Sequence, residues 1–175
     1  MLKYYGKPEY INYLTGVGRE CERRLQTIGI KHGEILFYGE HQSIEWGKCE
    51  KITDGYYIIT INGLLVKNKY RKALEETIFH EILHTCTGCY NHGEEWKRLC
   101  GIVENRLGIK ISTYDSYIDK GVDLNDFMNY NSYKYAISCK KCGITYFRKK
   151  KSLFVKNYGK YRCGACGGEL YVPFN

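Results

Sequence analysis

Hydrophobic residues recur at helical spacing near the start of the chain. Pro8 suits the first turn of a helix, and apolar side chains follow it every three or four residues until Gly29. The pattern then changes, because β-branched and aromatic residues dominate residues 35–62 and culminate in the run 56–61. A Thr-Asp-Gly turn at 53–55 divides this stretch. We therefore expect one helix followed by a β-hairpin.

The period becomes helical again from about residue 69, where apolar side chains return every four residues, and Gly88 offers a stop. A further amphipathic stretch at 94–107 begins with two acidic residues, which suit the positive end of a helix dipole, and a glycine follows it. Residues 109–133 are rich in Tyr, Asn and Asp with weak periodicity. We expect them to form connecting segments with one short helix, so the fold class is α+β.

The composition is typical of a globular protein, with 43% hydrophobic and 26% charged residues. No stretch approaches the roughly 18 apolar residues that a membrane span needs, and residues 1–8 lack the apolar core of a signal peptide. We expect a cytoplasmic, monomeric protein with no membrane partner. In a reducing compartment, the nine cysteines favour metal sites over a disulfide framework.

Positive charge is concentrated at the C-terminal end. Residues 134–175 carry ten of the 27 Lys and Arg side chains and a single acidic residue, Glu169. The first 133 residues carry 17 basic and 18 acidic side chains and are nearly neutral. This asymmetry predicts two domains, 1–133 and 134–175, of which the second faces a polyanion.

His80 and His84 lie four residues apart on the predicted second helix, so both imidazoles project from one face and can bind one Zn²⁺. Glu81 lies beside them, where a carboxylate can take a proton from a zinc-bound water. The sequence His80-Glu81-Ile82-Leu83-His84 therefore matches the H-E-x-x-H pattern of zinc metallopeptidases.

A catalytic zinc needs a third protein ligand and an open position for water. His92 follows His84 by eight residues, and the loop after Gly88 can bring it back to the metal. A glutamate from the next helix is the competing third ligand. The three competing glutamates are Glu94, Glu95 and Glu104.

The C-terminal segment carries two C-x-x-C pairs, separated by twenty residues. This is the spacing of a zinc ribbon in which each pair forms a tight knuckle, and we expect a β-hairpin between the knuckles. Four thiolates leave no open position, so this second zinc is structural, and a domain with so little core needs it to fold. The four predicted ligands are Cys139, Cys142, Cys163 and Cys166.

Basic and aromatic residues alternate between the two cysteine pairs. Basic side chains neutralise phosphates, and aromatic rings stack on unpaired bases, so we expect this segment to bind single-stranded or damaged DNA. The alternative is a solvated hairpin whose rings pack the small ribbon core. The predicted contacts are Arg148, Lys149, Lys150, Lys151, Lys156, Lys160, Arg162, Tyr146 and Phe147.

These motifs together resemble the SprT-like metallopeptidases, the family that includes Spartan-type proteases. The likeness runs over most of residues 35–175, and its ordered set of motifs is more specific than any one of them. The matching segments are Trp46-Gly47, Cys49, 57–62, Leu64-Leu65, 76–84, 92–96 and the four-cysteine ribbon. The resemblance implies a zincin-like fold with zinc ligands at His80, His84 and His92 and a catalytic Glu81. Cys86 and Cys89 in the loop between the histidines depart from the pattern. They are either a redox or second metal site or two structural cysteines.

The sequence thus predicts a zinc-dependent endopeptidase with one catalytic and one structural Zn²⁺. Its substrate is a protein, and the resemblance implies a protein bound or crosslinked to DNA. Two other hypotheses remain open. One is a non-catalytic DNA-binding or regulatory adaptor that retains the zincin scaffold. The other is a peptidase for one specific protein, such as a repressor, with the ribbon binding that partner.

Overall fold

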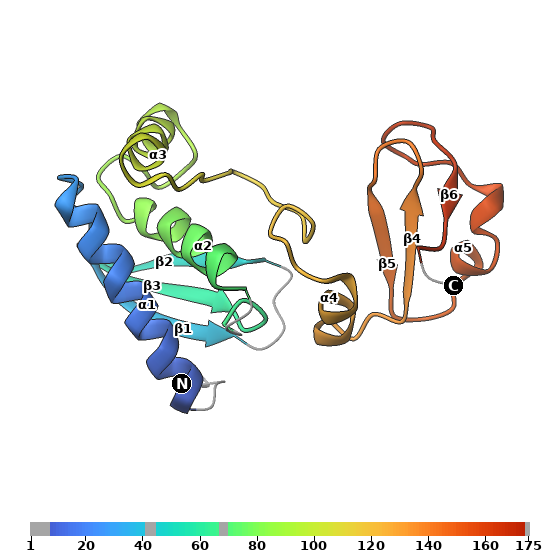
Figure 1. Ribbon diagram of the computed structural model, residues 1–175, viewed down its shortest axis with the longest axis horizontal. Helices are drawn as coiled ribbons and strands as arrows, with labels where there is room; N and C mark the ends of the chain where they lie inside the picture. The colour runs from blue at the N-terminus through green and yellow to red at the C-terminus, as the bar shows by residue number, and fades with distance from the viewer. Residues whose placement is uncertain (1–7, 41–44, 67–69, 174–175) are drawn as a thin grey trace. The chain divides into compact units, whose positions relative to one another are not determined.

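The computed structural model describes residues 8–40, 45–66 and 70–173, which form an α+β fold as the sequence predicts. The chain divides into two compact units, Met1–Val122 and Asp123–Asn175, drawn in Figure 1. Within the described residues, no helix is long and apolar enough to cross a membrane.

Unit 1 contains a three-stranded sheet with β3 at its centre, in the order β1-β3-β2. Its strands are β1 (Glu34–Glu40), β2 (Gly47–Thr53) and β3 (Tyr56–Asn62). β2 and β3 pair antiparallel, which confirms the predicted hairpin, and Gly55 in their turn has a φ of 80°. β1 runs parallel to β3, so the sheet is mixed rather than antiparallel throughout.

Three helices complete unit 1: α1 (Pro8–Thr27), α2 (Arg71–Leu83) and α3 (Glu94–Leu107). Helices α1 and α2 pack on the sheet, on the same side in Figure 1, because apolar rows on both elements meet there. Ile59 and Ile61 of the central strand and Leu74 and Ile78 of α2 are fully buried. The α3 prediction is confirmed, with Gly108 in a left-handed C-cap.

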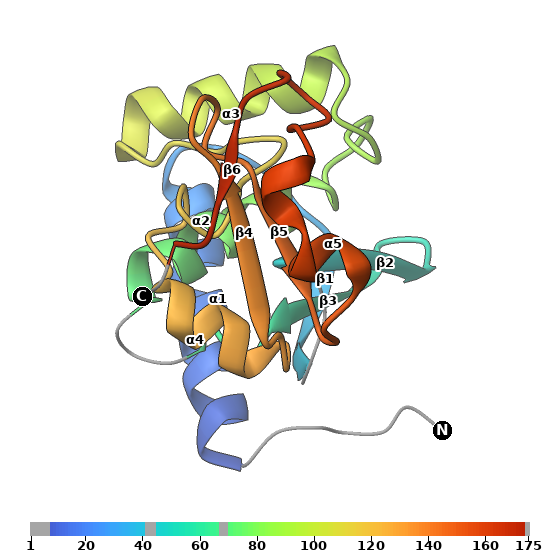
Figure 2. The same cartoon turned by 90° about the vertical axis from the view of Figure 1, so that its right-hand side faces the viewer.

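Unit 2 contains a second three-stranded sheet, in the order β5-β4-β6. Its strands are labelled in Figure 2. Its elements are α4 (Leu124–Tyr130), β4 (Tyr135–Cys139), β5 (Thr145–Arg148), α5 (Leu153–Lys156), the 3₁₀ turn η2 (Tyr158–Lys160) and β6 (Leu170–Tyr171). The expectation of a hairpin between the two cysteine pairs is wrong. β5 pairs with β4, which ends at Cys139, the first cysteine of the first pair. Ser152 caps the helix α5 where a second strand was expected.

Helix α4 is the short helix expected in the connecting region, and the Asp123 side chain caps it by accepting from the amides of Asn125 and Asp126. Its Phe127 ring lies 5.0 Å, centroid to centroid, from the ring of Phe147 in β5. Because α4 packs on the second sheet in this way, the two units divide after Val122. The charge pattern places the boundary later, after residue 133.

Candidate metal centres

Helix α2 positions the first two histidines of the candidate catalytic centre. His80 lies in its last turn, and His84 is its C-cap with φ −66° and ψ −16°, so the helical path continues through both residues. The helix proper therefore ends before the predicted stop at Gly88, yet the four-residue spacing still places both rings on one side. Their Nε2 atoms lie 3.2 Å apart.

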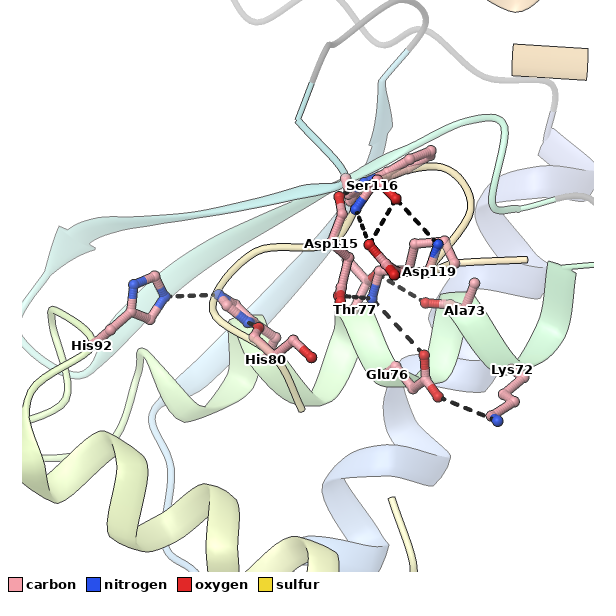
Figure 3. A network of polar contacts seen from close by, with 12 residues as sticks. Lys72, Ala73, Glu76, Thr77, His80, His92, Asp115, Ser116 and Asp119 are labelled. Atoms are coloured by element: carbon pink, nitrogen blue, oxygen red, sulfur yellow. Dashed lines mark hydrogen bonds and ion pairs between the residues drawn. The ribbon is translucent and has the colours of Figure 1, made fainter. Parts of the chain in front are cut away.

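The loop after α2 returns His92 to the same point. His92 Nε2 lies 3.1 Å from His84 Nε2 and 3.0 Å from His80 Nε2. Figure 3 shows a ring nitrogen of His92 pointing toward a ring nitrogen of His80. Gly88, with a φ of 78°, supplies the left-handed residue that the turn needs.

In His80 and His84, the hydrogen bond made by Nδ1 determines which ring nitrogen carries the proton. His80 Nδ1 donates to the carbonyl of Ser112 at 2.9 Å, and His84 Nδ1 donates to the carbonyl of Cys89 at 2.8 Å. A carbonyl can only accept, so each neutral ring carries its proton on Nδ1 and presents a lone pair at Nε2.

The lone pairs of His80 and His84, which face each other at 3.2 Å, repel, and a cation between them removes the repulsion. Nitrogens at about 2.0–2.1 Å from one tetrahedral zinc lie about 3.3 Å apart, which is close to the observed spacing. Burial, followed by the charges of His84 and His92, lowers the pKa of His80 to about 4. The ring is therefore neutral near pH 7, as a metal ligand must be. These observations fit a zinc tripod.

Trp96 of α3 forms the floor under all three imidazoles. Its side chain is 1% exposed, and its ring centroid lies 4.8 Å from that of His80, 5.5 Å from His84 and 4.5 Å from His92. The indole stacks on His84 and meets the other two rings edge to face. A rigid ring in this position limits the rotamers of the three histidines.

Glu81 is buried, with 6% of its surface exposed. Burial, together with the charge of Glu45, raises its pKa to about 8, and the positive charge of Lys120 opposes this shift. Gly47, the first residue of β2, lies directly against the carboxylate. A Cβ at residue 47 would come within 2.7 Å of Glu81 Oε1 and 2.9 Å of Thr77 Cγ2. Glycine is therefore required at this close approach.

The four predicted ribbon cysteines also converge. Cys139 and Cys166 have their Sγ atoms 3.5 Å apart, and Cys142 and Cys163 have theirs 3.6 Å apart. All four ligand atoms lie within 4.8 Å of one another. Sulfurs at about 2.3 Å from one tetrahedral zinc lie about 3.8 Å apart, so the group fits a closed site.

Tyr146 supports the ribbon site from outside the four ligands. Its hydroxyl lies 3.2 Å from Cys163 Sγ and accepts from the amide of Gly164 at 3.2 Å. The hydrogen bond between the Tyr146 hydroxyl and Cys163 Sγ is the main cause that lowers the pKa of Cys163 to about 6. Gly168 packs so closely that a Cβ there would lie 2.8 Å from Cys139 Sγ.

The SprT-like family model matches residues 19–115, more than half of the chain, and includes His80, Glu81, His84 and His92. The chain belongs to the SprT-like family. A search of curated proteins gives no match. Family membership assigns unit 1 to the zincin-type metallopeptidase-like domains, and the four-cysteine cluster of unit 2 is consistent with a zinc ribbon.

Of the competing third ligands in the SprT-like domain, the structure brings His92 to His80 and His84. Among the described residues, no glutamate joins the group of three histidines that could hold a metal ion. Glu95 instead forms two 2.7 Å hydrogen bonds with Arg98, and Glu94 and Glu104 are exposed on α3.

Cys86 and Cys89 are both buried, and neither belongs to a metal-binding group within the described residues. Burial raises the pKa of Cys86 to about 12, and its Sγ points to the carbonyl of Ile82 at 3.9 Å. This placement favours the structural interpretation. Cys89 supports the histidine site through its backbone carbonyl, which accepts the hydrogen bond from His84 Nδ1.

All seven basic residues predicted to contact DNA are exposed. The two predicted stacking rings have other contacts. The Phe147 ring packs against the rings of Phe127 and Tyr133, with centroids 5.0 and 5.1 Å away, and Tyr146 packs on the ribbon core. Tyr161, which was not among the predicted contacts, is 43% exposed.

Several residues around the site carried no sequence signal. The carbonyl of Ser112 belongs to the backbone, so residue type does not reveal it. Lys120 lies in a segment without periodicity, yet its side chain is 6% exposed and its Nζ lies 2.8 Å from Asp115 Oδ2. Trp46 donates its Nε1–H to the carbonyl of Asp115 at 2.8 Å. The resemblance included Trp46 without indicating this role.

Proposed function

We propose that this SprT-like protein is a zinc-dependent endopeptidase. His80, His84 and His92 hold the metal, and Glu81 is the general base. The observation that carries the proposal is the convergence of three Nε2 atoms within 3.0–3.2 Å, beside a buried carboxylate. Zinc bound there acts as a Lewis acid and lowers the pKa of a bound water to about 7.

The protein's own groups carry out the proton transfer. Burial raises the pKa of Glu81 to about 8 in the metal-free protein, so the carboxylate, once ionised, is a stronger base than an exposed glutamate. After it has taken the proton, the resulting acid can return that proton to the leaving amine. Gly47 lies directly against the Glu81 side chain and limits its motion on that side. His80 and His84 keep their Nδ1 protons on backbone carbonyls and so hold their Nε2 lone pairs in place.

Substituting Glu81→Gln tests this function, because the amide keeps the shape of the side chain and cannot take the proton. We expect unchanged zinc content and a loss of proteolysis of at least about 100-fold. Glu104→Gln, on the exposed face of α3, is the matched control and should match wild type. Cleavage by Glu81→Gln at the wild-type rate would refute the mechanism. Wild-type protein that holds zinc and never cleaves would favour the adaptor hypothesis.

We further propose that the ribbon holds the peptidase near DNA, so that DNA-bound or DNA-crosslinked proteins are its substrates. The support is the ten Lys and Arg side chains against one acidic residue in 134–175, with the predicted contacts exposed. Such binding should weaken steeply with salt.

The charge-reversal variant Lys149→Glu/Lys150→Glu/Lys151→Glu tests the DNA tether. It should lose affinity for single-stranded DNA and DNA-stimulated cleavage, while cleavage of a free protein stays unchanged. A matched reversal at Lys72, 92% exposed on α2 in unit 1, should change neither. Equal DNA affinity of variant and wild type at low and moderate salt would reject the tether. It would leave the hypothesis of a peptidase for one specific protein.

A further inference from the structure

The segment that connects α3 to unit 2 contacts the histidine site. This strap, residues 109–122, follows the C-cap Gly108 and contains a turn at 117–121. The carbonyl of its Ser112 accepts from His80 Nδ1 at 2.9 Å. Among the described residues, the second such hydrogen bond, from His84 to Cys89, stays within the loop that follows α2, whereas the bond from His80 reaches the strap. The strap therefore orients one metal ligand.

The strap also reaches the wall beside Glu81. The carbonyl of Asp115 accepts from Trp46 Nε1 at 2.8 Å. Trp46 is followed by Gly47, whose Cα lies so close that an added Cβ would meet the Glu81 carboxylate. Asn62 of β3 also holds Trp46, since the backbone N–H of Asn62 donates to the Trp46 carbonyl at 2.9 Å. One carbonyl of the strap thus contacts a metal ligand, and a second contacts Trp46, the residue before the glycine that lies against the proposed base.

A buried cation holds the strap in this position. The Lys120 side chain is 6% exposed, and its Nζ lies 2.8 Å from Asp115 Oδ2 within the strap and 4.0 Å from Glu76 Oε2 on α2. Both carboxylate side chains are 17% exposed. Figure 3 shows Glu76 on α2, one turn before His80, with Asp115 close to it.

The turn that carries Lys120 is itself closed by polar contacts. Asp119 accepts from the Ser116 amide at 2.8 Å and from the Ser116 hydroxyl at 2.6 Å, as drawn in Figure 3. The Lys120 amide donates to the Ser116 carbonyl. The ammonium is therefore delivered by a defined turn to two carboxylates. Removing it leaves both of them partly buried and without this charge, which is unfavourable.

We propose that Lys120 is a positioning residue for the histidine site. By pairing with Asp115 and Glu76 it holds the strap on α2. It thereby keeps the Ser112 carbonyl on His80 and the Asp115 carbonyl on Trp46. The effect on catalysis rests on the proposed function, whereas the effect on metal binding does not.

Lys120→Met removes the charge and keeps a long unbranched side chain. Substituting a residue that orients a metal ligand without touching the metal changes metal affinity or activity by about 10–100-fold. We expect zinc affinity of the histidine site to fall by at least about tenfold, and kcat to fall with little change in KM. Lys72→Met is the matched control. Lys72 pairs with the same Glu76 at 3.8 Å but is 92% exposed, so its loss should change neither quantity.

The measurement uses the full chain loaded with zinc. Competition with a chromophoric chelator gives two affinities, and the ribbon site serves as the internal reference that should not move. NMR of the imidazole N–H protons reports the strap directly, because His80 Nδ1–H stays protected from exchange while it is bonded to Ser112. We expect this signal in wild type and Lys72→Met, and its broadening or loss in Lys120→Met. Lys120→Arg, which keeps the charge, should restore much of the signal and of the affinity.

A second variant keeps the test decisive if Lys120→Met does not fold. Asp115→Ala alters no backbone carbonyl and removes the nearer of the two carboxylates that pair with Lys120, so it should also weaken zinc binding and expose His80 Nδ1–H. Wild-type zinc affinity and a retained Nδ1–H signal in either folded variant would overturn the proposal. If the variants lose both and the wild-type protein nonetheless shows no proteolysis, the strap stands and the proposed function fails.

Discussion

Gly47→Ala gives a sharp prediction, because a single methyl group is added at a measured distance from the proposed base. The new Cβ would lie 2.7 Å from Glu81 Oε1 and 2.8 Å from its Cγ, against an ordinary contact distance of 3.4 Å or more. The Glu81 side chain must therefore shift by roughly 0.7 Å. Misplacing a reacting group by about 1 Å costs on the order of 100-fold in rate, so we expect kcat to fall by about 10–100-fold.

The same variant should keep its zinc, since the three atoms nearest the added methyl group belong to Glu81 and Thr77 and not to a histidine. Gly47 has no positive φ, so the backbone accepts alanine and the cost arises from overpacking, at about 1–3 kcal/mol. Gly101→Ala is the matched control. It lies inside α3 with nothing within 4 Å of the added Cβ, and it should leave kcat unchanged and stabilise the protein slightly.

The assay combines initial rates on an unstructured protein substrate, zinc stoichiometry and thermal unfolding. Wild-type kcat in a zinc-loaded Gly47→Ala protein would refute the argument that this wall fixes Glu81. Loss of zinc together with activity would also refute it, because the perturbation would then act through the tripod.

Three further predictions concern the supports of the two metal centres. Trp96→Ala removes the floor under the histidines and should cost about 3–5 kcal/mol of stability and weaken zinc binding there, whereas Trp96→Phe should retain most of both, as unfolding and chelator titrations would show. Tyr146→Phe removes the hydroxyl on Cys163 and should lower ribbon zinc affinity by about tenfold; an unchanged affinity would show that the contact is incidental. Because burial raises the pKa of Glu81 from its ordinary value of 4.5 to about 8 in the folded protein, its contribution to stability falls as the pH rises from 4.5 to about 8, and the full cost is present above that range. Glu81→Gln should therefore raise the Tm of the metal-free protein more at pH 9 than at pH 5, and equal shifts would argue against a buried, high-pKa carboxyl.

The sequence predicted the elements that depend on local patterns. Gly108 ended α3 where expected, and the turn at 53–55 separated β2 from β3. The shared face of His80 and His84 required a helix alone, because it follows from the 3.6-residue period. The spacing of the four ribbon cysteines likewise sufficed, because short knuckles fix their own geometry.

Features that depend on long-range pairing or on the backbone could not be predicted. The parallel pairing of β1 with β3 joins strands with another strand between them in sequence, and alternation does not encode this order. The segment after β5 folds into α5 because Ser152 caps it, although its basic and aromatic residues fit a strand equally well. The strap acts through carbonyls and one buried lysine, neither of which has a recognisable spacing.

Mass spectrometry of cleavage products tests the central claim most directly. A protein substrate is incubated with wild-type and Glu81→Gln proteins, each shown to carry two zinc ions per chain, and new internal termini are sought. Our account predicts internal cleavage by the wild type that chelation abolishes and added zinc restores, with none by Glu81→Gln. Internal cleavage of equal extent by both proteins, or by neither, would contradict it.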